Sequence, residues 1–214
     1  MTKEYFTLDA SVAVVQAPAS IAASGYSPGL DLKPYNDMLS VFLTSLNTAG
    51  ALPTLAAKLQ SAIASNLVGA ITYAGTGNGR LTEVVGGPDA VAENITVTFS
   101  SATAFAVSGS VTGSMGAGVV GTKFSCPQIS LIANVGATAF VNTDVFTVPM
   151  AARVYTDIPG AAFTGLTTGA SIQAIGLEMD SIGRYLRAAY TIGGTVSPAY
   201  TVGVGMLAML QGSP

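Results

Sequence analysis

Short runs of alternating apolar and polar residues, separated by turn residues, dominate the chain from about Ile71 onward. Asn94–Phe99 and Thr103–Ser108 are examples of such runs. Alternation with a period of two lets one face of a strand pack inward while Thr and Ser face water. Asn78-Gly79 and Gly193-Gly194 supply residues that tolerate the positive φ of tight turns. This pattern predicts half-buried strands joined by hairpins.

One segment also fits a helix. From Leu52 to Leu67, apolar residues recur at intervals of three and four, the spacing of one helical face. The same segment also fits a strand that ends near Gln60. Both interpretations stay open from the sequence.

Two other stretches predict irregular backbone. Residues 1–36 contain Pro18, Pro28 and Pro34 among Ala, Ser and Gly, which is typical of an extended arm and not of a core element. The Gly-rich tract Gly109–Gly121 predicts a loop at the tip of a hairpin.

The distribution of charge suggests where domains begin and end. Between Asn94 and Thr143 only Lys123 is charged, whereas charged residues are more frequent again after Met150. We therefore predict an all-β chain in which a β-sandwich module is interrupted by an inserted second small β domain. The N-terminal arm spans 1–36, the sandwich module 37–68 and 151–214, and the inserted domain 69–150.

Composition excludes most familiar chemistry. The 214 residues include 8 basic and 11 acidic side chains, a charged fraction of 9%, 50% hydrophobic residues, no His, no Trp and one Cys. The usual general base and zinc ligand are therefore missing, and no intramolecular disulfide can form. Eight scattered basic residues give no reason to expect a nucleic-acid partner. We expect no enzyme activity, no cofactor and no metal ion.

The N-terminal residues predict neither secretion nor membrane insertion. Glu4 and Asp9 lie where a signal peptide would need positive charge followed by an apolar run. Ala10–Ala23 is interrupted by Gln16 and Pro18, and is too short to cross a bilayer.

Several motifs superficially indicate catalysis or ligand binding. Gly75–Gly79 has the wrong spacing for a dinucleotide loop, and Gly25–Gly29 matches a nucleophile elbow at Ser27 although no His could activate that serine. Glu178 and Asp180 could share one face of a strand, but Arg184 and Arg187 follow closely and favour local ion pairs. We expect Asp144 to bond the backbone of its own turn, and Cys126 to be a small buried apolar residue.

Two pairs of stretches carry a resemblance to a family. The first pair contains PTLAAKLQS (53–61) and GRYLR (183–187), with GGTVSP (193–198) following; the second contains GNGRLT (77–82) and FVNTDVFTV (140–148). The first resembles a β-sandwich module of tailed-bacteriophage virion proteins, in which the two strands pair. The second is similar to a β unit of phage head-decoration proteins, with Thr143 standing where that pattern usually has Gly.

The resemblance implies a phage virion structural protein, most simply a decoration, or cement, protein on the outer surface of the capsid. Its partners would be the major capsid protein and copies of itself in a homo-oligomer, with no nucleic acid and no membrane. It would be made in the host cytoplasm and localise to the virion. A low charge fits a surface covered by neighbouring subunits.

Aromatic residues of the predicted arm are the candidate partner-binding residues. They are Tyr5, Phe6, Tyr26 and Tyr35, and the alternative is that they pack on the protein's own core. Two other functions stay open: a tail or fibre component of the virion, and a carbohydrate-binding β-sandwich for host attachment. A sugar site would need exposed aromatic rings beside Asp, Asn or Arg.

Overall fold

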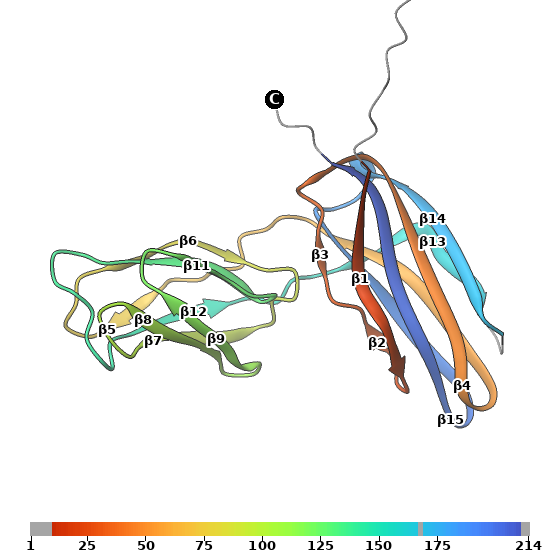
Figure 1. Ribbon diagram of the computed structural model, residues 1–214, viewed down its shortest axis with the longest axis horizontal. Coiled ribbons are helices and arrows are strands. Elements are labelled where there is room, and N and C mark those ends of the chain that lie inside the picture. Colours follow the sequence, from red (N-terminus) through yellow and green to blue (C-terminus); the bar gives the residue numbers. More distant parts are fainter. Residues whose placement is uncertain (1–9, 167–168, 211–214) are drawn as a thin grey trace, which may run out of the picture. The chain divides into compact units, whose positions relative to one another are not determined.

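A computed structural model describes residues 10–166 and 169–210 and is built almost entirely of antiparallel strands (Figure 1). The all-β prediction is confirmed. The chain divides into two compact units. Unit 1 comprises the residues up to Ala64 and from Tyr155 onward, and unit 2 comprises Ser65–Val154.

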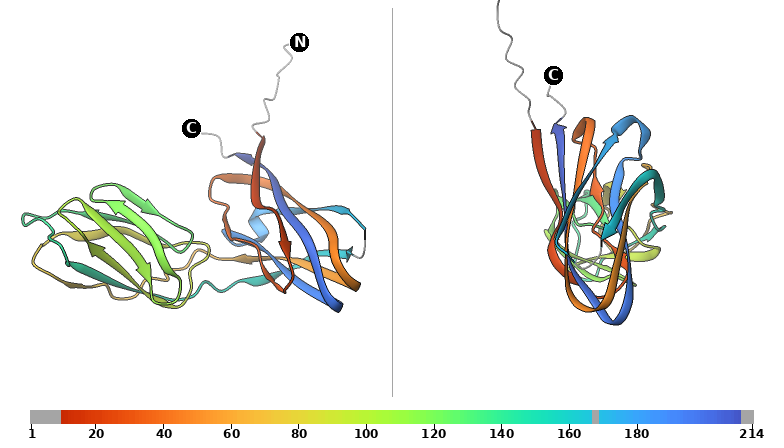
Figure 2. Two further views of the ribbon diagram at one scale, coloured as in Figure 1. Left: turned by 60° about the horizontal axis from the view of Figure 1, so that its bottom comes forward. Right: turned by 90° about the vertical axis from the view of Figure 1, so that its right-hand side faces the viewer.

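Unit 1 is organised by two unusually long strands, β4 (Tyr35–Ala62) and β15 (Tyr185–Leu210). They pair antiparallel along their whole length, from Tyr185 opposite Ala62 to Leu210 opposite Tyr35. The register is irregular between Gly193 and Ala199, where the ribbon of two strands bends back on itself (Figures 1 and 2). Gly50 lies at this bend with φ +99°, and its α-carbon is so close to Pro198 that a Cβ would meet the proline backbone at 2.6 Å.

The bend turns the ribbon into two layers. In the first layer, the N-terminal half of β4 and the C-terminal half of β15 are flanked by β14 (Ser171–Glu178) and β1 (Ala10–Ile21). In the second layer, β13 (Thr156–Leu166) pairs with the C-terminal half of β4. The short strands β2 (Gly25–Tyr26) and β3 (Leu30–Asp31) pair with the N-terminal half of β15. A turn of 3-10 helix, η1 (Met179–Ser181), links β14 to β15.

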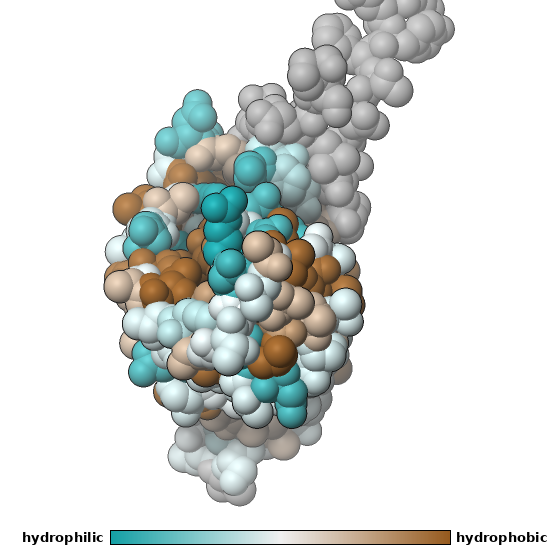
Figure 3. Space-filling model, turned by 90° about the vertical axis from the view of Figure 1, so that its left-hand side faces the viewer, coloured by the Kyte–Doolittle hydropathy of each residue, from teal (hydrophilic) through white to brown (hydrophobic). Residues whose placement is uncertain are grey.

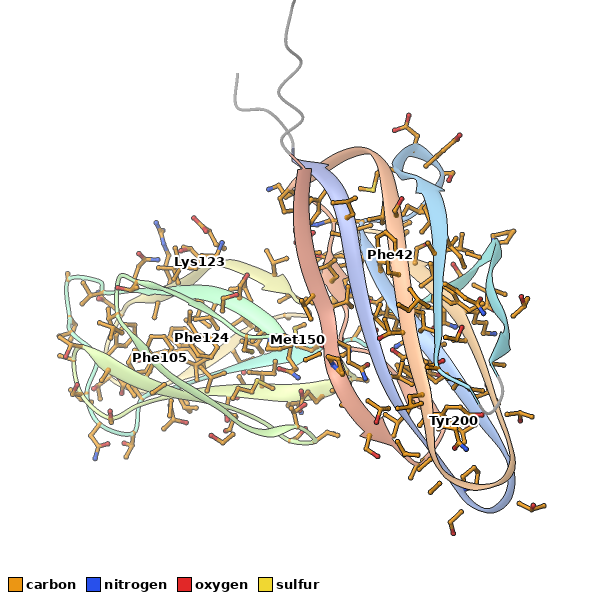
Figure 4. The ribbon with its side chains drawn as sticks, turned by 45° about the vertical axis from the view of Figure 1, so that its right-hand side comes forward. Phe42, Phe105, Lys123, Phe124, Met150 and Tyr200 are labelled. Atoms are coloured by element: carbon orange, nitrogen blue, oxygen red, sulfur yellow. The ribbon has the colours of Figure 1, made fainter. Side chains whose placement is uncertain are left out.

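Alternate residues of the two layers meet in one core. The first layer contributes Leu39, Val41 and Leu43, and the second contributes Leu55 and Leu59. Tyr200, fully buried, belongs to the same cluster and lies near the bend (Figure 4). Unit 1 is therefore a β-sandwich whose central strands in both layers belong to the same two segments.

Unit 2 has its own pair of sheets. The five-stranded sheet has the order β5 (Thr72–Ala74), β12 (Val145–Met150), β7 (Glu93–Phe99), β8 (Ala104–Gly109), β9 (Gly113–Val119). The three-stranded sheet has the order β10 (Lys123–Ser125), β11 (Ile129–Asn134), β6 (Arg80–Gly86).

Aromatic rings fill the core of unit 2. Phe99 stacks on Phe140 with ring centroids 3.8 Å apart, and Phe105 meets Phe124 edge-on (Figure 4). Cys126 lies half-buried against this core, and its Sγ contacts the carbonyl oxygen of Ile129.

Asp144 ties the loops of unit 2 together. Its carboxylate, 2% exposed, accepts hydrogen bonds from the backbone N–H groups of Thr76, Gly77 and Val141 and from the Tyr73 hydroxyl. Burial alone would raise the pKa of Asp144, but these hydrogen bonds outweigh burial and lower the pKa to about 2. Burial and the bond to this carboxylate raise the pKa of Tyr73 to about 12. Asp144 thus bonds its own turn, as expected, and also a loop that is remote in sequence.

The structure supports the strand alternative for Leu52–Leu67, and two other local predictions are wrong. Leu52–Leu67 is not a helix, because β4 continues to Ala62 and buries Leu55, Ala57 and Leu59 at every second position. The predicted loop at Gly109–Gly121 contains strand β9, and only residues 110–112 form the turn that precedes it.

The second wrong prediction concerns the predicted arm at 1–36. Within the described part of that range, β1, β2 and β3 all pair with β15, and Leu32 is buried in the core. Pro18 is accommodated because β1 is an edge strand and its register shifts between Gln16 and Ala19. Residues 1–9 lie outside the described residues.

Candidate functional site

Strand register brings a group of polar and aromatic side chains together on the outer face of the second layer. Ala189 of β15 lies opposite Tyr26 of β2 and opposite Lys58 of β4. In the next outward-facing row, Gln60 lies opposite both Arg187 and Asp157. Directly opposed residues of antiparallel strands point to the same face, so the two rows form one surface.

Arg187 belongs to this surface and lies close to two aromatic rings. Its guanidinium carbon is 3.7 Å from the ring centroid of Tyr26 and 4.1 Å from that of Tyr155. Its Nε donates a 2.9 Å hydrogen bond to Oε1 of Gln60. The ring quadrupoles attract the cation, and the amide fixes the orientation of the planar group.

A second set of contacts holds Gln60. Its Nε2 donates to Oδ1 of Asp157 at 2.7 Å, and Lys58 Nζ lies 2.5 Å from the other oxygen of the same carboxylate. The hydrogen bonds from Lys58 and Gln60 lower the pKa of Asp157 below its ordinary value. The polar chain therefore runs from Lys58 through Asp157 and Gln60 to Arg187. We call Tyr26, Lys58, Gln60, Tyr155, Asp157 and Arg187 the arginine cluster.

A shallow hollow adjoins the cluster. It has a volume of about 300 Å³ and is lined by Ser24, Gly25, Tyr26, Lys58, Gln60, Ala189, Tyr190 and Thr191. Tyr26 is 61% exposed, an unusual exposure for an aromatic residue that is already held in place.

The sequence-predicted binding residues do not come together. Tyr26 lies in the arginine cluster, whereas Tyr35 begins β4 and packs half-buried against the core of unit 1. Tyr5 and Phe6 lie outside the described residues.

Gln60 and Tyr155 were not predicted as site residues, and Arg187 has other partners than those expected from the sequence. The expected ion pairs of Arg184 and Arg187 with Glu178 and Asp180 are not those found. Arg184 instead forms a two-bond pair with Asp31 of β3, at 2.8 and 2.6 Å. The one sequence signal for the cluster was the pairing of the segments 53–61 and 183–187, because it sets Gln60 opposite Arg187.

Ser27, the candidate nucleophile, has a structural role. It is 4% exposed, donates from Oγ to the carbonyl oxygen of Pro28 and accepts a hydrogen bond from the N–H of Ala188. These contacts attach the segment after β2 to β15.

The arginine cluster offers groups that are suited to binding. Within residues 10–166 and 169–210, no group of three or more His, Cys, Asp or Glu is placed to hold a metal ion. The described residues also include no helix that is long and apolar enough to cross a membrane. An exposed aromatic ring, a fixed guanidinium and neighbouring polar groups instead suit recognition of a partner.

Comparisons with known proteins leave the family open. No protein-family model and no curated protein matches the chain. Two crystal structures of FlgL from Xanthomonas campestris are similar to parts of it, with TM-scores of 0.31 and 0.30 and sequence identities of 14% and 17%. They cover 47% and 54% of this chain, and the chain spans 33% of FlgL in each. Likeness at this level carries no functional argument.

Proposed function

We propose that the protein is a virion structural protein of a tailed bacteriophage that decorates the outer capsid surface and bridges major capsid subunits. One observation carries the proposal. The two segments that resemble the phage β-sandwich module, 53–61 and 183–187, are paired strands, with Arg187 opposite Gln60 and Tyr185 opposite Ala62. This is the pairing that the resemblance implies.

The surface supports a role in assembly. Exposed apolar side chains include Val14 and Ile172 in unit 1 and Val111 in unit 2, and the exposed fraction of Ile172 reaches 77%. Apolar and hydrophilic residues also lie side by side on the face drawn in Figure 3. A chain with only 9% charged residues loses little by covering such surfaces with neighbours.

The function would be mechanical. Each bound copy buries interface between subunits, and many modest contacts repeated over a shell resist the pressure of packaged DNA through avidity. No reacting group is needed for this role.

Co-sedimentation with expanded phage heads that lack decoration tests the proposal. We expect saturable binding at a fixed ratio to the major capsid protein, and a higher temperature of head disruption once the sites are filled. Recovery of the protein only with isolated tails would overturn the capsid role and favour the tail or fibre alternative.

A carbohydrate-binding role is the second candidate, favoured by one specific observation. The exposed Tyr26 ring lies beside Arg187, with Gln60 and Asp157 next to it, the combination that a sugar site needs. Binding to host-surface polysaccharide, with no binding to undecorated heads, would support this candidate over decoration.

A further inference from the structure

The guanidinium of Arg187 is held in place, but only part of its hydrogen-bonding capacity is used. Two aromatic rings lie against the group, and its Nε donates a hydrogen bond to Oε1 of Gln60. Among the described residues, none accepts a hydrogen bond from its two terminal nitrogens. Arg187 therefore keeps a pair of donors available on a group whose orientation is already set.

A fixed guanidinium is suited to an oxyanion. The parallel N–H groups of Arg match the two oxygens of a carboxylate in a bidentate pair, which is stronger and more directional than a single bond to Lys. Since Tyr26, Tyr155 and Gln60 hold the group before binding, little side-chain entropy is left to lose on association.

The charges around the cluster favour an acidic ligand. Arg187 and Lys58 are positive and Asp157 is negative, so this face carries a positive balance on a chain whose net charge is −3. Two basic groups are too few for stable binding to a nucleic-acid backbone, which needs several phosphate contacts. Tyr and Arg are also the residues that most often dominate protein–protein interfaces.

We propose that the arginine cluster receives an Asp or Glu side chain of the major capsid protein. The terminal nitrogens of Arg187 bind the carboxylate, and the exposed Tyr26 packs against the stem of the same side chain. This inference rests on the proposed function, because it names the chemical group by which that partner is recognised.

The first test compares R187Q and R187K with the wild type for binding to undecorated heads. We expect R187Q to weaken binding by about 30-fold or more, the loss typical of a dominant interface residue. R187K keeps the charge but loses the paired donors, so we expect it to weaken binding clearly as well. R80Q is the matched control, because it removes the same charge from an exposed position of unit 2 and should bind like the wild type.

Y26A keeps the test decisive if the Arg187 variants fold poorly. Tyr26 is mostly exposed, so its removal leaves the core intact. We expect weaker head binding with only a small fall in the unfolding temperature, because the contact between Tyr26 and Arg187 is lost. Wild-type binding by folded R187Q and Y26A would overturn the inference and leave decoration standing. Absence of binding by the wild type would overturn both.

Zero-length cross-linking identifies the ligand. R187K, bound to heads at saturating concentration and treated with a carbodiimide, should form an amide between the introduced amine and a capsid Asp or Glu, detected by mass spectrometry. The free variant, treated in the same way, controls for reaction with its own Asp157. A cross-link to a second copy of this chain, or binding of the wild type to a glucuronate polymer in place of heads, would contradict the proposal.

Discussion

The backbone angle φ of Thr143 explains why the resembling phage pattern has Gly at this position. The position where the resembling phage pattern has Gly holds a threonine with φ +78°, in the left-handed region that a β-branched residue adopts only at a cost. Thr143 is exposed and keeps this conformation because the hydrogen bonds of Asp144 hold the turn. The N–H of Thr143 also donates a hydrogen bond to the carbonyl oxygen of Phe99.

We predict that T143G stabilises unit 2. Glycine removes the cost of the left-handed conformation, about 1–2 kcal/mol, from the folded state. It also gives the unfolded chain more conformational entropy, which offsets part of this gain, so the net increase in stability should be about 0.5–1 kcal/mol. Urea unfolding measures it. T143A is the control, because alanine keeps the Cβ and should gain less. Equal stability of T143G and T143A would show that the backbone angle is not the cause.

Asp144 makes the stability of unit 2 depend on pH. Its pKa is about 2 in the folded chain and near its ordinary value of 3.8 when unfolded. The unfolded state therefore binds the proton more readily, so this contribution is fully present above pH 4 and is lost as the pH falls towards 2.

The variant D144N should lower stability at neutral pH and flatten the loss of stability between pH 4 and pH 2. Asparagine places an NH₂ group among donors that need an acceptor. Thermal unfolding across this pH range measures both effects. D157N, at an exposed carboxylate of unit 1, is the comparison. An acid dependence in D144N as steep as in the wild type would contradict the assignment.

The candidate site was only partly predictable from the sequence. Tyr26 could be chosen as an aromatic residue in a Gly- and Pro-rich segment, but its partner Arg187 is 161 positions away. Proximity along the chain suggested Glu178 and Asp180 for Arg187. Which residues share a face depends on strand register, and single-residue chemistry does not determine register.

At the scale of elements, two features explain why local patterns misled. Ala56 and Lys58 face outward between buried Leu55, Ala57 and Leu59, and alanine on the outer face made the apolar spacing compatible with a helix. Pairing with β15 overrides that preference. The Pro-containing segment predicted as an arm became edge strands for the same reason, since a neighbouring strand offers its backbone as a partner.

The bend of the β4–β15 ribbon gives a prediction at this scale. In G50A the new Cβ would meet the Pro198 backbone in a residue already at positive φ. We expect unit 1 to lose at least about 2 kcal/mol, the left-handed cost plus the clash. In G160A, φ is +75° and nothing lies within 4 Å of the added Cβ, so only the backbone cost remains. Chemical denaturation of both variants separates the two contributions, and equal losses would mean that the close approach at the bend is relieved without cost.

At the scale of the whole molecule, the chain joins two units with separate cores. The two ends of unit 2 lie together, because Val68 bridges Met150 and the N–H of Ala151 bonds the carbonyl oxygen of Leu67. In unit 1, Thr156 lies opposite Ser61, so the points where the chain leaves and re-enters the sandwich are neighbours as well. A unit closed in this way needs no contact with the rest of the chain to complete its sheets.

Removal of unit 2 tests whether each unit folds alone and which unit binds the phage head. Joining Ala64 to Tyr155 by a short Gly-rich linker should give a chain that unfolds cooperatively, and residues 65–154 alone should do the same, as calorimetry would show. The arginine cluster lies wholly in unit 1, so the shortened chain should still bind undecorated heads, with R187Q in that background as control. A shortened chain that folds but no longer binds would assign the shell contact to unit 2, because the cluster is present in it and its strands are intact.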